Sequence, residues 1–266
     1  MAEAKSWWRL PPQHLKASRP SAWSMGLHVT GVVVLLVLLV AWGFARSGYN
    51  PQWDSIWPYR VAFVEGVLTT LTIGVVSMGL SMVFGLVTAL MMRSRLIVLR
   101  ALARVYVELI RGTPLLVQIL ILFYLIAQAA GLQDRYTAGV LILSFFAGAY
   151  LAEIFRAGIE SVGAPQWEAA RAIGLTSQQT FRLVVLPQAG RAILPPLTGQ
   201  LASLIKDSSL LSIISINEAT LAAQNIASTS YSSLEIYLPL AGAYLLFTLP
   251  LSAVTRALEE RMSRAS

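Results

Sequence analysis

The residues that could do chemistry in this sequence are a few charged and hydroxyl side chains inside long apolar stretches. Glu153 lies in one such stretch, and Lys206, Asp207, Ser208 and Ser209 follow one another in a second. A charged side chain inside a bilayer costs about 2.5 to 3.5 kcal/mol on insertion scales, so it needs a partner, an aqueous cavity or a bound solute. These five residues are therefore the candidate residues of a substrate path.

Two interpretations of residues 206–209 are open. Their charges and hydroxyls could line a path near the middle of the membrane and meet the carboxylate and ammonium of a polar solute. Alternatively, they form a structural network that kinks or pins their helix. Glu153 lies one helical turn before Arg156, so it either belongs to the path or anchors the loop that follows. A direct pair between Glu153 and Lys206 is not expected, because Lys206 lies roughly 22 Å along its helix from the nearest cytoplasmic charge.

Several other kinds of site are excluded by the composition. The sequence has no cysteine, which excludes disulfides, thiolate metal ligands and cysteine nucleophiles. Its two histidines, His14 and His28, do not form a metal-binding pair, so neither a catalytic nor a metal site is predicted. No Gly-x-x-x-x-Gly-Lys-Ser/Thr phosphate loop occurs, so the chain is not expected to bind a nucleotide itself. The net charge is +7, but the basic residues form no patch, so no nucleic-acid partner is expected.

The composition places the chain in a lipid bilayer. Hydrophobic residues make up 56% of the sequence and charged residues 12%, which is too apolar for a soluble domain. A helix needs about 20 apolar residues to cross roughly 30 Å of hydrocarbon. We therefore predict an all-α, polytopic membrane protein with six transmembrane helices. The predicted spans are residues 29–45, 66–92, 112–133, 136–152, 192–217 and 236–255.

The first of these spans is interpreted as a retained anchor and not as a signal peptide, because its basic arm is long and no convincing cleavage site follows it. The predicted domains are residues 1–60, comprising a cytoplasmic arm, the first span and an outer loop, and a transport domain of residues 61–262.

The distribution of positive charge predicts the orientation, because cytoplasmic loops keep Lys and Arg during insertion. Every Lys and Arg except Arg46, Arg60, Arg135 and Lys206 lies in one of four regions. These regions are residues 1–25, the second and the fourth loop between the predicted spans, and the C-terminus. Both termini are therefore expected to be cytoplasmic.

The cytoplasmic loop of residues 156–191 carries helix signals and is too long for a simple connector. Pro165 suits a first helical turn, Gly174 marks the end of a short helix, and Thr176 is suited to cap a second helix. Pro187 is expected to end that second helix. We therefore expect two short helices that expose a knob of low bulk to a partner's groove. The residues expected on the knob's surface are Ala169, Ala170, Ile173 and Leu175.

The same loop matches a known motif. Glu168, Ala169, Ala170, Gly174, Leu186 and Pro187 have the identity and spacing of the EAA loop of ATP-binding-cassette (ABC) importer permeases. Val184 stands where that family usually has isoleucine, and Pro165 stands where glycine is usual, which stiffens the first turn of the loop. Other segments are similar to the polar amino-acid uptake branch of the family. They are residues 106–116, 149–159 and 206–210, together with Gly66, Thr70 and Leu71.

The resemblance implies a type I ABC importer permease fold with cytoplasmic coupling helices, in the bacterial inner membrane. It implies a permease subunit, not an enzyme, that translocates polar amino acids and is coupled to an ATPase through the EAA loop. The implied partners are two cytosolic ATP-binding subunits, a second permease subunit that is identical or homologous, and an extracytoplasmic solute-binding protein. No cofactor is expected on this chain, because ATP and Mg²⁺ would be bound by the partner ATPase.

An ion-coupled secondary transporter of small polar solutes is the alternative function. Six spans are few for most such folds, and such a transporter would have no use for an EAA loop. A membrane-embedded enzyme would need a nucleophile and a base within the bilayer, and the sequence presents neither as a recognisable pair. The sequence leaves open which amino acid is carried, whether the permease pairs with itself, and whether a substrate site lies in this chain.

Overall fold

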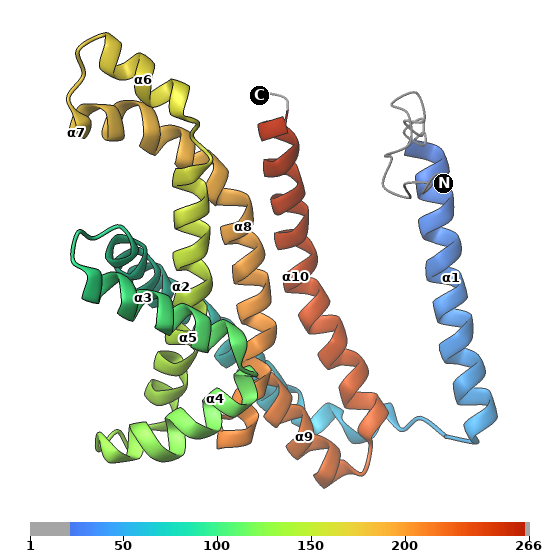
Figure 1. Cartoon of the computed structure of the whole chain (residues 1–266). Coiled ribbons are helices and arrows are strands. Elements are labelled where there is room, and N and C mark those ends of the chain that lie inside the picture. The colour runs from blue at the N-terminus through green and yellow to red at the C-terminus, as the bar shows by residue number, and fades with distance from the viewer. Residues whose placement is uncertain (1–21, 264–266) are drawn as a thin grey trace, which may run out of the picture. The chain divides into compact units, whose positions relative to one another are not determined.

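The computed structural model describes residues 22–263, and the described residues contain helices and turns but no strand (Figure 1). The chain forms two units, Met1–Pro51 and Gln52–Ser266. The first unit contains one described helix, α1 (Ala22–Ser47). Its apolar segment Thr30–Ser47 is long enough to cross a membrane.

The second unit contains the remaining helices. Its α-helices are α2 (Arg60–Met92), α3 (Ile97–Gly112), α4 (Leu115–Ile121), α5 (Arg135–Glu160), α6 (Ala164–Ala172), α7 (Ser177–Thr180), α8 (Leu186–Asp207), α9 (Ala219–Ser230) and α10 (Ser233–Ser263). Short 3-10 turns are η2 (Trp53–Ser55), η3 (Trp57–Tyr59) and η6 (Ser208–Ile214), and π-helical turns are η4 (Leu122–Ala127) and η5 (Phe181–Val185).

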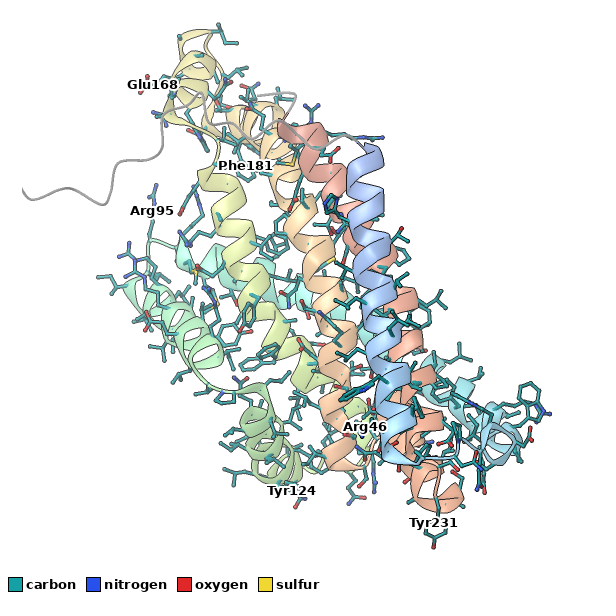
Figure 2. All side chains as sticks on the ribbon, turned by 90° about the vertical axis from the view of Figure 1, so that its right-hand side faces the viewer. Arg46, Arg95, Tyr124, Glu168, Phe181 and Tyr231 are labelled. Carbon is teal, nitrogen blue, oxygen red and sulfur yellow. The ribbon has the colours of Figure 1, made fainter. Side chains whose placement is uncertain are left out.

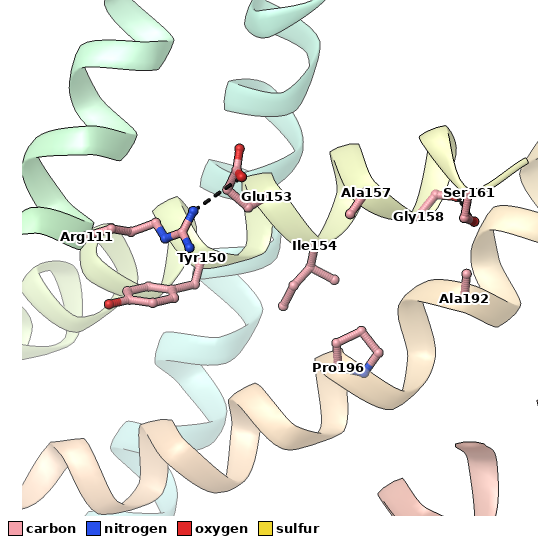
Figure 3. Close-up of a pocket in the computed structure, with 9 residues that line it drawn as sticks. All are labelled: Arg111, Tyr150, Glu153, Ile154, Ala157, Gly158, Ser161, Ala192 and Pro196. Atoms are coloured by element: carbon pink, nitrogen blue, oxygen red, sulfur yellow. Dashed lines mark hydrogen bonds and ion pairs between the residues drawn. The ribbon is translucent and has the colours of Figure 1, made fainter. Parts of the chain in front are cut away.

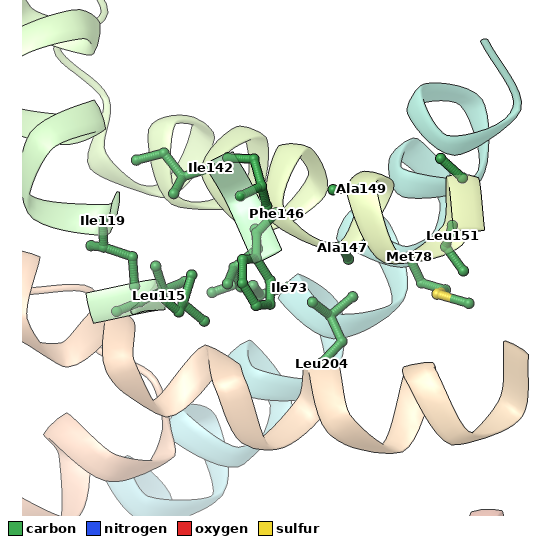
Figure 4. Packing of buried hydrophobic residues seen from close by; sticks show 14 of the residues in the cluster. Ile73, Met78, Leu115, Ile119, Ile142, Phe146, Ala147, Ala149, Leu151 and Leu204 are labelled. Atoms are coloured by element: carbon green, nitrogen blue, oxygen red, sulfur yellow. The ribbon is translucent and has the colours of Figure 1, made fainter. Parts of the chain in front are cut away.

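The crossing of α2 and α5 forms the centre of the second unit. A Cβ atom added at Gly85 would lie 2.6 Å from the Cβ of Leu151 and 3.1 Å from the backbone N of Ala152. Small residues allow this approach, which matters in lipid because van der Waals contact, not the hydrophobic effect, drives helix association. Buried side chains of α2, α5 and α8, including Ile73 and Leu204, fill the space around the crossing (Figure 4).

A second cluster of buried side chains joins α9 and α10 to the beginning of α2. A Cβ atom added at Gly66 would lie 2.6 Å from the Cβ of Ala222, so α9 also rests on a glycine of α2. Both clusters of buried side chains therefore include residues of α2. The sequence places small residues at helical spacing along this helix, and the structure uses Gly66, Gly74 and Gly85 for close contacts within the chain.

The start of α5 is defined by a charged cap. Asp134 accepts hydrogen bonds from the hydroxyl and, at 2.8 Å, from the backbone N–H of Thr137. These bonds favour the ionised carboxylate and hold the pKa of Asp134 below its ordinary value. The cap satisfies donors that would otherwise be orphaned at the first turn.

The six predicted spans are not all found as single apolar helices. Among the described residues, four helical segments are long and apolar enough to cross a membrane, and a bent pair could make a fifth. The bent pair is α3 with α4 and η4, which meet at an angle of 114°. The count of six is therefore not confirmed.

Two predicted spans differ from the structure for local reasons. The predicted span 112–133 is broken at Thr113 and Pro114, both of which have extended backbone angles, as expected where proline disfavours helix at the preceding residue. The predicted span 192–217 is helix α8 only as far as Asp207, and it contains Pro195 and Pro196.

The α2–α5 crossing predicts that Gly85→Ala destabilises the chain. The added methyl group meets backbone atoms that cannot rotate away, so the free energy of unfolding should fall by about 1–3 kcal/mol. Gly79→Ala is the matched control in the same helix, because nothing lies within 4 Å of an added Cβ there. Thermal unfolding of the purified protein in detergent measures both variants. Equal melting temperatures would show that the crossing is not tight.

Candidate functional site

Helices α6 and α7 lie beyond the ends of α5 and α8, at the same end of the second unit as the C-terminal end of α10 (Figure 1). Figure 2 shows the side chains of Glu168 and Phe181 at this end and those of Tyr124 and Tyr231 at the opposite end. We refer to residues 164–187 as the coupling segment.

The coupling segment has most of the local features that its sequence predicts. Helix α6 has Pro165 in its first turn, where the missing N–H costs nothing. Gly174 follows the helix with φ of +83°, a left-handed conformation suited to glycine. Thr176 then caps α7 in a reciprocal capping box. Its hydroxyl accepts from the backbone N of Gln179 at 3.3 Å, and its own backbone N donates to Gln179 Oε1 at 2.9 Å.

The expectation that Pro187 ends the second helix is wrong. The chain continues from α7 through the π-helical turn η5 into α8, and Pro187 lies in the first turn of α8. In the π-helical turn, the backbone N–H of Leu186 donates to the carbonyl of Phe181, five residues earlier. This pattern accommodates a proline that has no N–H to donate. The coupling segment is thus continuous with α8.

The predicted coupling residues are mostly exposed, with one correction. Glu168, Ala169, Gly174, Leu186 and Pro187 are exposed. Ala170 was expected on the surface, but it is buried.

The burial of Ala170 follows from the packing of α6 against the π-helical turn η5. Ala170 is only 3% exposed and lies three residues after Trp167, so the two share a face of α6. Trp167 packs on a cluster around Val185 and Ala189. Ile173, which directly follows α6, is 77% exposed and presents a large apolar side chain to the surface.

A cavity of about 410 Å³ lies between α3, α5 and α8 (Figure 3). Its wall extends along α5 from Tyr150 to Ser161, which is three residues before α6 begins. Ala192 and Pro196 of α8 close the opposite side. The cavity is therefore next to the coupling segment.

An ion network lies in the wall of this cavity. The carboxylate of Glu153 contacts the guanidinium groups of Arg156 at 2.9 Å and Arg111 at 3.2 Å, and Arg156 also contacts Glu160 at 2.6 Å. The Arg111 guanidinium lies over the ring of Tyr150, 5.5 Å from its centroid. The network ties the end of α3 to α5.

These contacts bear on two expectations from the sequence. The i, i+3 spacing of Glu108 and Arg111 allows either a local pair or a gate element, and in the structure Arg111 contacts Glu153, 42 positions along the chain. Glu153 is held by two arginines, and its part in a substrate path stays a prediction.

Residues 206–209 form the junction between α8 and η6. Lys206 is exposed, Asp207 and Ser209 are half-buried, and Ser208 is buried with its hydroxyl donating to the carbonyl of Ile205 at 2.8 Å. Within the described part of the chain, no ion pair joins Lys206 to Asp207 or to Glu153. The structure therefore brings these four residues together but does not join them to Glu153.

The structure shows a buried carboxylate that the sequence analysis missed. Glu218 is fully buried and caps α9, accepting from the backbone N–H groups of Thr220 and Leu221, each at 2.9 Å. It also accepts from the hydroxyls of Thr70 on α2 and Tyr244 on α10, each at 3.3 Å. One carboxylate thus holds three helices together.

Glu218 gives no signal as a charge inside an apolar span, because it directly follows the last residue of the predicted span 192–217. The signal that could have found it is an acidic residue directly before the helix-favouring run that begins at Ala219.

Comparison with known proteins gives consistent matches. The family described as “Binding-protein-dependent transport system inner membrane component” matches residues 81–264. The L-cystine transport system permease protein TcyB of Bacillus subtilis (strain 168) is 40% identical over 217 residues, covering 80% of this chain and 92% of TcyB. The glutamine transport system permease protein GlnP of Escherichia coli (strain K12) is 37% identical over 213 residues, covering 79% of this chain and 97% of GlnP.

Solved structures match as well. A crystal structure of an amino acid ABC transporter with histidines has a TM-score of 0.74 and 36% identity, covering 80% of this chain and 100% of that one. An inward-facing structure of the MetNI methionine ABC transporter has a TM-score of 0.59 at 20% identity, covering 76% of this chain and 98% of that one, and supports the fold alone.

The Glu218 network predicts that Glu218→Ala destabilises the chain strongly. The substitution removes a helix cap and leaves buried hydroxyl and N–H donors without an acceptor, so the free energy of unfolding should fall by roughly 2–4 kcal/mol. Glu65→Ala, at an exposed position of α2, is the control and should change stability by less than about 0.5 kcal/mol. Denaturant titration of both purified variants provides the measurement, and similar midpoints would contradict the assigned network.

Proposed function

The chain belongs to the family of inner membrane components of binding-protein-dependent transport systems, and from this premise we propose that it imports polar amino acids as a permease driven by a partner's ATP hydrolysis. The resemblance to ABC importer permeases that the EAA spacing predicted is confirmed. The alternative of an ion-coupled secondary transporter is not supported, because the solved structures that the chain resembles are ABC transporters.

The observation that carries this proposal is the coupling segment. It displays Glu168, Ala169 and Gly174 on an exposed pair of helices at one end of the unit. The cluster beneath it contains Ile159 of α5, Val162 from the turn after α5, and Ala189 and Ile193 of α8. Interiors packed in this way transmit displacement instead of absorbing it. A push on α6 and α7 would therefore move the adjoining ends of α5 and α8 relative to α3 and change the cavity that the three helices line.

The chemistry of ATP is assigned to a partner. The sequence contains no phosphate-binding loop, so ATP and Mg²⁺ belong to two cytosolic ATP-binding subunits that dock on the coupling segment. A second permease subunit, identical or homologous, would complete the path, and an extracytoplasmic binding protein would deliver the solute.

The coupling segment has to be cytoplasmic in this arrangement. The C-terminal end of α10, with Arg256 and Arg261, lies at the same end of the unit (Figure 1), and the N-terminal arm carries further Lys and Arg residues. Cytoplasmic segments of membrane proteins are enriched in these residues. Both termini are therefore proposed to be on the inner side of the bacterial inner membrane.

The proposed substrate class rests on relatives and on side-chain chemistry. TcyB and GlnP are named for L-cystine and glutamine transport, and amino acids carry a carboxylate and an ammonium group at neutral pH. The proposed path residues offer both charges and hydroxyls, namely Glu153, Lys206, Asp207, Ser208 and Ser209. Their partners in the free chain, such as Arg111 and Arg156 for Glu153, would exchange for groups of the solute.

Orientation can be tested directly because the chain has no cysteine. Glu168→Cys places one thiol on α6, and Ser228→Cys places one at an exposed position of α9, at the opposite end of the unit. In right-side-out vesicles, a membrane-impermeant maleimide should label Ser228→Cys and should label Glu168→Cys only after permeabilisation. The reverse pattern would place the coupling segment outside and would refute the proposed function.

Coupling is tested at Gly174, whose φ of +83° is costly for a branched side chain. Gly174→Val imposes strain of order 1–3 kcal/mol on the turn between α6 and α7. In proteoliposomes with the ATPase, the binding protein and radiolabelled amino acids, uptake and stimulated ATP hydrolysis should fall by about tenfold or more.

Gly174→Asn is the matched control, because asparagine adopts left-handed angles more readily. It should retain most of the activity. Normal stimulated hydrolysis by Gly174→Val would show that this turn does not transmit the signal.

A further inference from the structure

Tyr231 has an unusual backbone conformation. It ends α9 with φ of 54° and ψ of 24°, in the left-handed region, which glycine adopts freely and bulky residues rarely adopt. Its side chain is 92% exposed, so no packing of the ring compensates for the backbone. A residue kept in such a conformation points to a role outside the fold of the isolated chain.

The backbone on both sides of Tyr231 is held by hydrogen bonds. The backbone N of Ser232 donates to Ser230 Oγ at 3.3 Å, and the buried Ser232 hydroxyl lies 2.7 Å from that of Ser55. Three residues later, the buried Glu235 accepts from the backbone N of Gln52 at 2.6 Å. The turn is therefore fixed to η2 and the residue before it, while its aromatic ring projects from a rigid base.

The turn lies at the end of the unit opposite the coupling segment, as Figure 2 shows for Tyr231 and Glu168. Helix α10 begins two residues after Tyr231 and has 31 residues, which is about 46 Å at 1.5 Å per residue. This length exceeds the roughly 30 Å of a hydrocarbon core. The 23 residues of α10 before Arg256 alone span about 34 Å, so with Arg256 on the inner side the turn at the beginning of α10 lies at or beyond the outer edge of the bilayer.

The composition of the turn favours a protein partner over lipid headgroups. Tyr231 is surrounded in sequence by hydroxyl side chains only, since residues 228–233 read Ser-Thr-Ser-Tyr-Ser-Ser. One tyrosine among small hydroxyl residues is typical of protein-binding loops, because the ring supplies contact area at low entropic cost. Anionic headgroups attract Lys and Arg, and the sequence has neither between Lys206 and Arg256.

We propose that the turn of residues 228–233 is a docking point for the extracytoplasmic binding protein, with the ring of Tyr231 as its anchor. This inference rests on the proposed function, which requires such a partner at this face. The rigid base matters because an anchor whose backbone is already ordered loses little entropy on binding. The left-handed angle directs the ring outward, away from the helices that flank it.

The test exploits the backbone angle, because Tyr231→Gly removes the ring and at the same time relieves the strain. If position 231 contributed only to folding, the Tyr231→Gly variant should remain folded and should respond to the binding protein as the wild type does. We expect the purified variant to melt at or above the temperature of the wild type. The concentration of loaded binding protein that gives half-maximal stimulation of ATP hydrolysis should rise by about tenfold or more, as for loss of an aromatic anchor.

Two control variants sharpen the test. Tyr231→Phe keeps the ring and should shift the half-maximal concentration by less than about threefold, as expected when most of the contact area is kept. Ser215→Gly relieves the other positive φ of a non-glycine residue in the described chain, 61°, without removing an aromatic ring. It should be stimulated as the wild type is.

Three results would overturn the inference. The half-maximal concentration could be unchanged in Tyr231→Gly, or the variant could melt well below the wild type, which would assign a structural role. The effect could also appear in nanodiscs of anionic lipid but vanish in detergent micelles, which would identify a headgroup anchor. If no extracytoplasmic binding protein stimulates the wild type, the proposed function itself fails, and this inference fails with it.

Discussion

The close crossing of α2 and α5 is the contact on which the rest of the transport unit depends. In lipid, apolar side chains gain little by leaving their surroundings, so helices stay together only where their backbones approach closely enough for many van der Waals contacts. Gly85 and Gly148 provide this approach, each meeting atoms of the facing helix. Helix α8 packs on the pair that they form, and the coupling segment emerges from the ends of α5 and α8. A change at the crossing would therefore reach the end that carries the coupling segment through packed helices.

The continuity between the coupling segment and α8 determines how motion can be transmitted. A second helix that ended at a proline would be joined to α8 by a loose connection. Instead the π-helical turn η5 carries the helix past Pro187, and Val185 in that turn is fully buried against its neighbours. Below it, Pro195 and Pro196 interrupt the hydrogen bonding of α8 and offer a place for bending. The upper part of α8 can thus move with α6 and α7 while its lower part stays packed in the core.

The two ends of the unit stabilise buried or half-buried carboxylates in different ways. Near the coupling segment, Glu153 is matched by the positive charges of Arg111 and Arg156. Near the opposite end, Glu218 is matched by hydroxyl and backbone donors, and within the described part of the chain its hydrogen-bond partners include no arginine or lysine. An ion pair in a partly exposed cavity can exchange partners with water or a solute at modest cost. A fully buried network has no such exchange available, so the junction of α2, α9 and α10 around Glu218 should be the more rigid of the two.

The sequence by itself determined those features whose physical cause acts within a few residues. Pro165 in a first turn, the left-handed Gly174 and the capping box of Thr176 depend on neighbours about one helical turn away. The apolar stretches and the EAA spacing are longer, but each lies within one continuous segment of the chain. Only the tertiary structure decided which side chains meet across the fold. It buried Ala170, paired Arg111 with Glu153, and brought Thr70 to Glu218 across 148 positions. Such contacts depend on how whole helices pack, and helix packing is set by many weak contacts summed along each interface, which a local pattern of residues does not specify.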